Sequence, residues 1–116
     1  MPIKVNEAAI AHARQMVSEG RYRINSVWRD NQPTADSAAA YAAKHGADEA
    51  ARWYLAFNPD MPSESPDRLL YPVGDFSNVH ESGLRAARER AEVEGQAEIA
   101  AAAEDILEIF YRMNAC

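Results

Sequence analysis

Apolar residues recur every three to four positions throughout residues 96–113, so that they form one continuous face when the segment is helical. The opposite face carries the polar and charged side chains Glu98, Asp105, Glu108 and Arg112. A helix of this kind is stable only when other parts of the chain cover its apolar face. We therefore predict an amphipathic helix whose inner face consists of Ile99, Ala102, Ala103, Ile106, Phe110 and Met113.

The first half of the chain carries signals for three further helices. Asn6 is a suitable N-cap for the first helix, and Gly20 suits its C-terminal end. Residues 21–31 are predicted to be a loop with one helical turn. Thr34 suits the N-cap of a second helix over residues 35–45. A third helix is predicted after the glycine that ends the second, with an inner face formed by Ala50, Trp53, Tyr54 and Phe57.

The densest local pattern is YPVGDFSNVHESGLR, at residues 71–85. Pro72 fixes its own φ, and Gly74 can take a turn conformation that other residues avoid. Asp75 then stands where the N-cap of a helix belongs. Its carboxylate can accept a hydrogen bond from the backbone N–H of Asn78, and it favours the positive end of the helix dipole.

These signals predict a fourth helix over residues 76–94. His80 lies on or beside its buried face, and Gly83 on the inner row indicates that another element passes close by. Residues 58–70 hold three prolines and form the longest loop. No segment shows strand-like alternation. We therefore predict an all-α fold, a small compact bundle of about four to five helices with a Pro-rich loop before the fourth, in a single domain that covers residues 1–116.

The charge and composition exclude several classes of partner. The net charge is −6 and lies entirely in residues 61–116, so no basic surface is available to neutralise phosphates. We predict no nucleic-acid partner, and the same charge disfavours a membrane surface. No apolar run approaches the ~20 residues that cross a bilayer. One cysteine, Cys116, provides no disulfide framework, and this fits a reducing, cytoplasmic location.

A candidate binding site combines aromatic and titratable residues from the middle of the chain. Asp75 and His80 can form a carboxylate–imidazole pair of the kind that tunes a general base. Alternatively, Asp75 only caps a helix and His80 is a hydrogen-bonded core residue. The aromatic residues either line a pocket or partner groove, or form the core of the domain. The predicted binding residues are Trp53, Tyr54, Tyr71, Asp75 and His80.

The sequence contains no pattern that is typical of a metal, phosphate or cofactor site. Glu104 and Glu108 are four residues apart on a predicted helix, but no His or Cys accompanies them, so we predict no metal site. Gly74 is alone in its turn and makes no phosphate loop. We expect no cofactor.

Several motifs together resemble a family of short, uncharacterised bacterial proteins. They are RWYL at residues 52–55, YPVGDF at 71–76, VHESGLRAA at 79–87 and RA at 90–91. The family pattern is of the form WhLG…(Y/F)P-x-GDF…VH-x-(S/C)-G-L-x-AA-x-x-RA, and the likeness covers roughly residues 15–110. This chain departs from it at Ala56, where glycine usually follows the leucine. The resemblance implies no particular activity.

The sequence favours a small cytosolic protein of unknown function that acts by binding and has no catalytic activity. We expect a protein partner, or self-association into a homodimer through the last two helices. The sequence does not identify a small-molecule ligand. The alternative is a small enzyme or ligand-binding protein that uses the Asp75–His80 region. In that reading His80 is the general acid or base, and Asp75 orients it.

Overall fold

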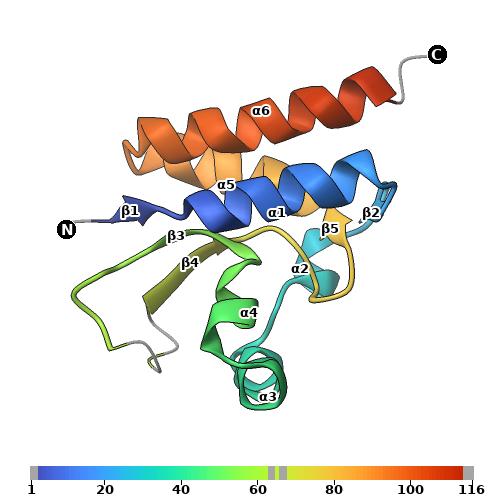
Figure 1. Cartoon of the computed structure of the whole chain (residues 1–116). Coiled ribbons are helices and arrows are strands. Elements are labelled where there is room, and N and C mark those ends of the chain that lie inside the picture. Colours follow the sequence, from blue (N-terminus) through green and yellow to red (C-terminus); the bar gives the residue numbers. More distant parts are fainter. Residues whose placement is uncertain (1–2, 63–64, 66–67, 114–116) are drawn as a thin grey trace.

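The computed structural model describes residues 3–62, 65 and 68–113 (Figure 1). Cys116 and residues 63, 64, 66 and 67 of the predicted Pro-rich loop lie outside the described residues. The described helices are α1 (Glu7–Ser18), α2 (Trp28–Asn31), α3 (Ala35–His45), α4 (Ala47–Ala51), α5 (Glu81–Val93) and α6 (Ala97–Met113). The described strands are β1 (Lys4–Val5), β2 (Tyr22–Arg23), β3 (Tyr54–Phe57), β4 (Leu69–Pro72) and β5 (Val79–His80).

The prediction of an all-α bundle is therefore wrong, because the chain forms a mixed fold with two small sheets. The larger sheet is antiparallel and has the order β1-β3-β4, with Val5 and Leu70 on either side of Ala56. The smaller sheet pairs β2 with β5 in parallel, so that Arg23 lies beside His80. This second pairing brings the segment before α2 to the start of α5, and it shapes the site described below.

The apolar run at residues 53–57 explains the main error. Its spacing fits a helix, but Tyr54, Leu55 and Ala56 are all buried, because β3 is the central strand and is covered on both faces. A strand buried on both sides shows no alternation of polar and apolar residues, so its sequence cannot be told from a buried helical segment. Only α4, which ends at Ala51, remains of the predicted third helix.

The predicted fourth helix begins later than expected. Phe76 has a φ of 69° and breaks the helical path, and the chain passes through β5 before α5 begins at Glu81. The prediction that Asp75 is the N-cap is therefore wrong, since His80 occupies that position. Gly83 is buried on α5 as expected, and the element close to it is α2, whose Trp28 ring packs directly over it.

The remaining helix predictions are confirmed. Asn6 caps α1 by accepting a hydrogen bond from the N–H of Ala9, and Gly20 follows the helix with a φ of 79°. Thr34 caps α3 through a capping box with Ser37. The C-terminal helix runs from Ala97 to Met113, as its apolar periodicity predicted. Its predicted inner face is only partly right, because Leu107 is also buried and Met113 is 43% exposed.

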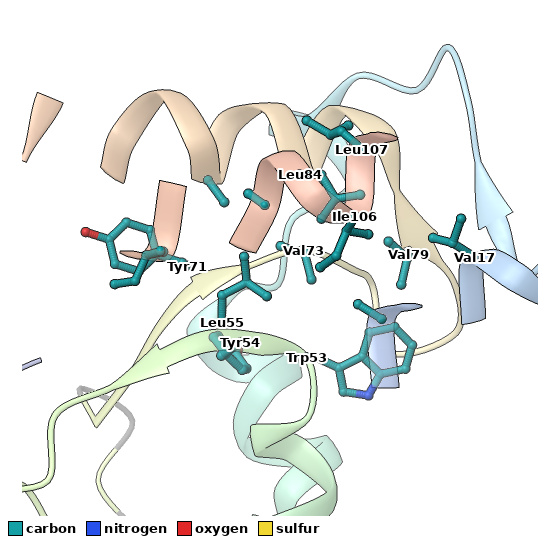
Figure 2. Close-up of a cluster of buried hydrophobic side chains, with 14 of the residues drawn as sticks. Val17, Trp53, Tyr54, Leu55, Tyr71, Val73, Val79, Leu84, Ile106 and Leu107 are labelled. Carbon is teal, nitrogen blue, oxygen red and sulfur yellow. The ribbon is translucent and has the colours of Figure 1, made fainter. Parts of the chain in front are cut away.

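The core lies between the larger sheet and the helices α1, α5 and α6, which Figure 1 shows on one side of that sheet. Figure 2 shows Leu55 of β3, Val73 after β4, Leu84 of α5 and Ile106 of α6 meeting in this core. Helices α3 and α4 lie on the other side of β3, and no residue of α3 is fully buried. None of the described helices is both long and apolar enough to cross a bilayer.

Candidate functional site

The turn between β4 and β5 is built around Gly74. The residue forms an isolated bridge with Val79, and a Cβ at this position would lie 2.4 Å from the Trp53 ring and 2.7 Å from the carbonyl oxygen of Asn78. The sequence interpretation assigned Gly74 a special turn conformation. The structure shows instead that glycine is needed because the ring and the backbone leave no room for a side chain.

Asp75 is held by the backbone of the same turn. Its Oδ1 accepts hydrogen bonds from the N–H of Asn78 at 2.8 Å, as predicted, and from the N–H of Ser77 at 3.0 Å. Burial acts to raise the pKa of this carboxyl, but the hydrogen bonds from Asn78, His80 and Ser77 outweigh it, so the pKa lies below its ordinary value of 3.8. Asp75 is therefore a fixed anion at neutral pH.

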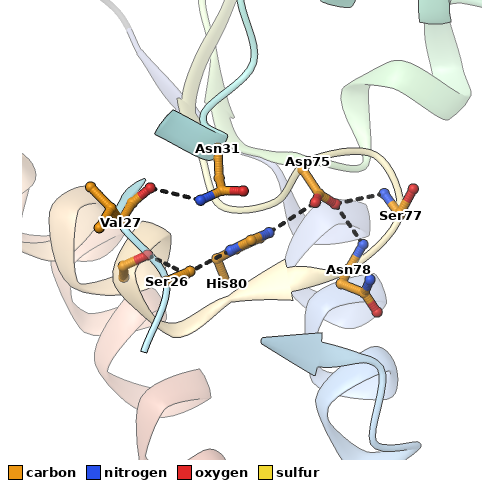
Figure 3. Close-up of polar contacts among 8 residues, drawn as sticks. Ser26, Val27, Asn31, Asp75, Ser77, Asn78 and His80 are labelled. Carbon is orange, nitrogen blue, oxygen red and sulfur yellow. Dashed lines mark hydrogen bonds and ion pairs between the residues drawn. The ribbon is translucent and has the colours of Figure 1, made fainter. Parts of the chain in front are cut away.

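His80 lies at the centre of a hydrogen-bonded chain (Figure 3). The ring is 2% exposed, its Nε2 lies 2.9 Å from Asp75 Oδ2, and its Nδ1 lies 2.8 Å from Ser26 Oγ. Because Asp75 is anionic, the proton belongs on Nε2, which donates to the carboxylate. The lone pair of Nδ1 then accepts from the Ser26 hydroxyl. We refer to Ser26, Asp75, His80 and Ser82 as the His80 cluster; Ser82 Oγ lies 3.0 Å from Ser26 Oγ.

Sequence reasoning did not find Ser26, which is 54 residues from His80. The β2–β5 pairing, together with a left-handed φ of 58° at Asn25, brings Ser26 to the start of α5. Trp28 then packs against the His80 ring, with 5.7 Å between the ring centroids. Gly83 on the inner row was the only sequence signal that a bulky group approaches this point, and it did not identify the serine.

The predicted site residues are divided between different places. Asp75 and His80 form the predicted pair. Trp53 is 4% exposed, and its ring lies beneath Gly74 and against His12 of α1, with 5.0 Å between the ring centroids. It is a core residue that supports the turn from below.

Tyr71 lies apart from the His80 cluster. Its ring is buried, and its hydroxyl donates to the carboxylate of Glu94, after the end of α5. Burial and this hydrogen bond raise the pKa of Tyr71 to about 12. Tyr71 therefore anchors β4 to the end of α5, and the structure does not place it beside Asp75 or His80.

Tyr54 lines a groove of about 570 Å³ on the other side of the molecule. We refer to it as the alanine groove, because eight alanines of α3 and α4 line it, including Ala39, Ala42 and Ala50. Phe57 and Leu69 of the larger sheet add further apolar surface. Because alanine has only a methyl group, the helices leave open the space that larger side chains would fill.

The polar groups of the alanine groove are few. Asn6 donates from its side chain to the carbonyl oxygens of Ala51 and Tyr54, and its amide is therefore already used. The Arg68 guanidinium lies over the Phe57 ring at 5.0 Å and donates to Met61 O at 2.6 Å.

Tyr54 itself is only 7% exposed, and among the described residues no group forms a hydrogen bond with its hydroxyl. Burial also raises the pKa of this hydroxyl, so it is neutral at physiological pH and can both donate and accept. The polar residues Asn6, Asp48, Ser65 and Arg68 also line the groove, so the Tyr54 hydroxyl is one polar group among a few.

Within the described ranges, no three His, Cys, Asp or Glu side chains gather in an arrangement that could hold a metal ion. Comparisons with family models, curated proteins and solved structures find no match to this chain. The resemblance to short bacterial proteins therefore stays a prediction, and function has to be argued from the two sites.

Proposed function

We propose that this is a binding protein that takes up a small, largely apolar molecule in the alanine groove. The observation that carries the proposal is the groove itself, which has a volume of about 570 Å³ and is lined mainly by alanine methyl groups together with Tyr54, Phe57 and Leu69. Ligand sites in proteins are usually clefts of about 300–1,000 Å³, mostly apolar with a few polar groups, and this groove has both properties.

The occupant is inferred from the chemistry of the lining. Alanine methyl groups together with Phe57 and Leu69 favour an aliphatic or aromatic body, whose burial contributes roughly 25 cal/mol per Å². The Tyr54 hydroxyl favours one carbonyl, hydroxyl or amine on that body. The volume of about 570 Å³ suits a molecule of this size better than a folded partner.

The proposal refines the expectation of a binding protein and moves it to a different surface. Of the predicted binding residues, Tyr54 alone lines the alanine groove; Trp53 and Tyr71 contribute to the core. A protein partner and a homodimer through the last two helices both stay predictions.

A fluorescent apolar probe, phenylnaphthylamine, tests the proposal together with two matched variants. Ala39→Phe places a ring in the groove, whereas Ala40→Phe places the same ring on an exposed position of the same helix outside it. We expect the wild type and Ala40→Phe to bind the probe with equal affinity, and Ala39→Phe to bind at least tenfold more weakly.

Two controls separate this result from other causes. Circular dichroism and the melting temperature check that both variants keep the fold, and size-exclusion chromatography checks the oligomeric state. If Ala39→Phe binds the probe like the wild type but changes a dimer into a monomer, the groove is a self-association surface and the ligand proposal is wrong. Native mass spectrometry of the untagged protein then identifies any molecule that copurifies with it.

A further inference from the structure

The His80 cluster has the arrangement of an activated serine. A nucleophilic hydroxyl requires a base within hydrogen-bond reach and a third group that orients the base. Here the Ser26 hydroxyl lies 2.8 Å from His80 Nδ1, and Asp75 Oδ2 lies 2.9 Å from the other ring nitrogen. These residues come from three separate segments, the β2–α2 loop, the β4–β5 turn and β5.

We propose that Ser26 is a nucleophile that accepts an acyl group from small carboxylic esters, with His80 as its base and Asp75 as a positioning residue. The roles of the two ring nitrogens follow from the contacts. Asp75 fixes the proton on Nε2, and Nδ1 is left free to take the proton of the Ser26 hydroxyl. Since two backbone N–H groups hold Asp75 by its other oxygen, the carboxylate cannot turn away from His80.

The start of α5 supplies the complementary electrostatics. Ser82 is in the first turn of this 13-residue helix, and its hydroxyl lies 3.0 Å from that of Ser26. The N-cap residue His80 makes no side-chain cap to the helix, so the N–H groups of Glu81 and Ser82 lack that partner. Such N–H groups and the positive end of the helix dipole stabilise the oxyanion that forms when a carbonyl is attacked.

The surface beside Ser26 indicates the class of acyl group. Ile24 and Val27, two residues before and one residue after Ser26, are 49% and 53% exposed. These exposed β-branched side chains flank Ser26 in the sequence and give its loop an apolar surface. They favour a short aliphatic acyl chain over a charged one.

The reaction balances with water as the only co-reactant. Ser26 Oγ forms a bond to the acyl carbon while its proton passes to His80 Nδ1, and the ester C–O bond breaks as that proton passes to the departing alkoxide. The products are acyl-Ser26 and an alcohol. Water then attacks the acyl carbon, gives its proton to Nδ1 and releases the carboxylic acid, and the proton returns to Ser26 Oγ.

A fluorophosphonate probe tests the nucleophile directly, because it bonds covalently to activated serines and adds a fixed mass. We expect intact-mass and peptide analysis of the wild type to place one adduct on Ser26. Ser26→Ala should abolish labelling, and His80→Gln should slow it by about 100-fold, the size of a typical general-base contribution. Ser18→Ala, at an exposed position of α1 outside the cluster, is the matched control and should keep labelling within about threefold.

The role of Asp75 needs a readout that a purely structural role would not change. We expect Asp75→Asn to lower the maximal labelling rate about tenfold while the probe concentration for half-maximal rate stays the same. Circular dichroism establishes that each variant is folded under the assay conditions. Hydrolysis of nitrophenyl acetate, followed through release of nitrophenolate, provides a second measurement with the same variants.

Three results would overturn the proposal. One is a folded wild type that is not labelled, while Ser26→Ala merely lowers the melting temperature; the cluster would then only hold the loop against α5. Another is labelling that His80→Gln leaves unchanged. The third is an adduct on Ser82 or another serine in place of Ser26. None of these results bears on ligand binding in the alanine groove, so the two proposals fail separately.

Discussion

The His80 cluster and the alanine groove differ in how their polar groups are satisfied. In the His80 cluster, both ring nitrogens of the buried imidazole have partners, and the carboxylate of Asp75 has three. In the groove, the buried Tyr54 carries a hydroxyl that no described residue bonds. The His80 cluster therefore links distant segments of the chain through hydrogen bonds, whereas the alanine groove leaves open space between α3, α4 and the larger sheet.

Phe76 connects the two regions. It follows Asp75 directly in the chain, and its ring stacks on Tyr41 of α3 with 4.4 Å between the ring centroids. The same ring meets Trp53 edge-on at 6.0 Å and Tyr54 at 6.4 Å. The turn that carries Asp75 therefore also supports α3, the helix that provides much of the groove.

The largest effect on stability is expected at Gly74, in the turn that also carries Asp75. Gly74→Ala places a Cβ 2.4 Å from the Trp53 ring and 2.7 Å from a backbone oxygen, and neither can move without disturbing the turn. We expect the variant to lower the free energy of unfolding by about 3 kcal/mol, as overpacked cores do. Chemical denaturation of the variant and the wild type measures the difference.

Gly83→Ala is the matched comparison for this change. The three atoms nearest its Cβ would all belong to the Trp28 ring, the closest at 2.8 Å, and that ring belongs to a short helix that can shift. Alanine also favours the helix by about 1 kcal/mol over glycine, so the net cost should be about 1 kcal/mol or less. In a Trp28→Ala background, Gly83→Ala should become stabilising. Equal costs for Gly74→Ala and Gly83→Ala would show that the turn is no more rigid than α2.

The sequence predicted those parts of the fold in which local signals decide the structure. Caps and periodicity identified α1, α3 and α6, because Asn6, Thr34 and the apolar face of α6 act within their own segments. The strands were missed because β3 is buried on both faces and because β2 and β5 have two residues each. Such short strands are defined by their partners in space and leave no pattern in the sequence.

The same distinction between local signals and long-range contacts applies to the candidate sites. The pairing of Asp75 with His80 was predictable, since they are five positions apart within one motif. The contribution of Ser26 depends on the β2–β5 pairing, and the alanine groove depends on where α3 and α4 lie against β3. Tertiary contacts decide both, and sequence spacing alone does not contain them.

A smaller effect is expected from the charge of Asp75. The pKa of this carboxyl is lowered in the folded protein, so the carboxylate stabilises the fold above its ordinary pKa of 3.8, and this contribution is lost as the pH falls through the lower, folded value. Asp75→Asn should therefore cost about 1–2 kcal/mol at neutral pH, and the difference from the wild type should shrink below about pH 4.

Thermal unfolding of the wild type and the variant between neutral and acid pH measures this difference. Asp105→Asn, at an exposed position of α6, is the control and should change stability by less than about 0.5 kcal/mol. A difference between Asp75→Asn and the wild type that is the same at every pH would show that the negative charge of Asp75 does not contribute.

The smallest effect on stability is expected in the alanine groove, where two tyrosines can be compared. Tyr71→Phe removes a hydroxyl that donates to Glu94 and should cost about 1 kcal/mol. Tyr54→Phe removes a hydroxyl without a described partner and should change the free energy of unfolding by less than about 0.5 kcal/mol. Denaturation of both variants in parallel measures the contrast.

A binding measurement with the same two variants, Tyr54→Phe and Tyr71→Phe, tests whether Tyr54 contacts a ligand. If Tyr54 is a polar contact of the groove, Tyr54→Phe should weaken binding of a ligand with a hydrogen-bonding group about fivefold, since one hydrogen bond contributes about 1 kcal/mol. Tyr71→Phe should leave that binding unchanged. A stability loss in Tyr54→Phe as large as that in Tyr71→Phe would mean that the protein itself holds the Tyr54 hydroxyl. Tyr54 would then be no candidate contact for a ligand, and only the volume and the apolar lining of the groove would support the proposal.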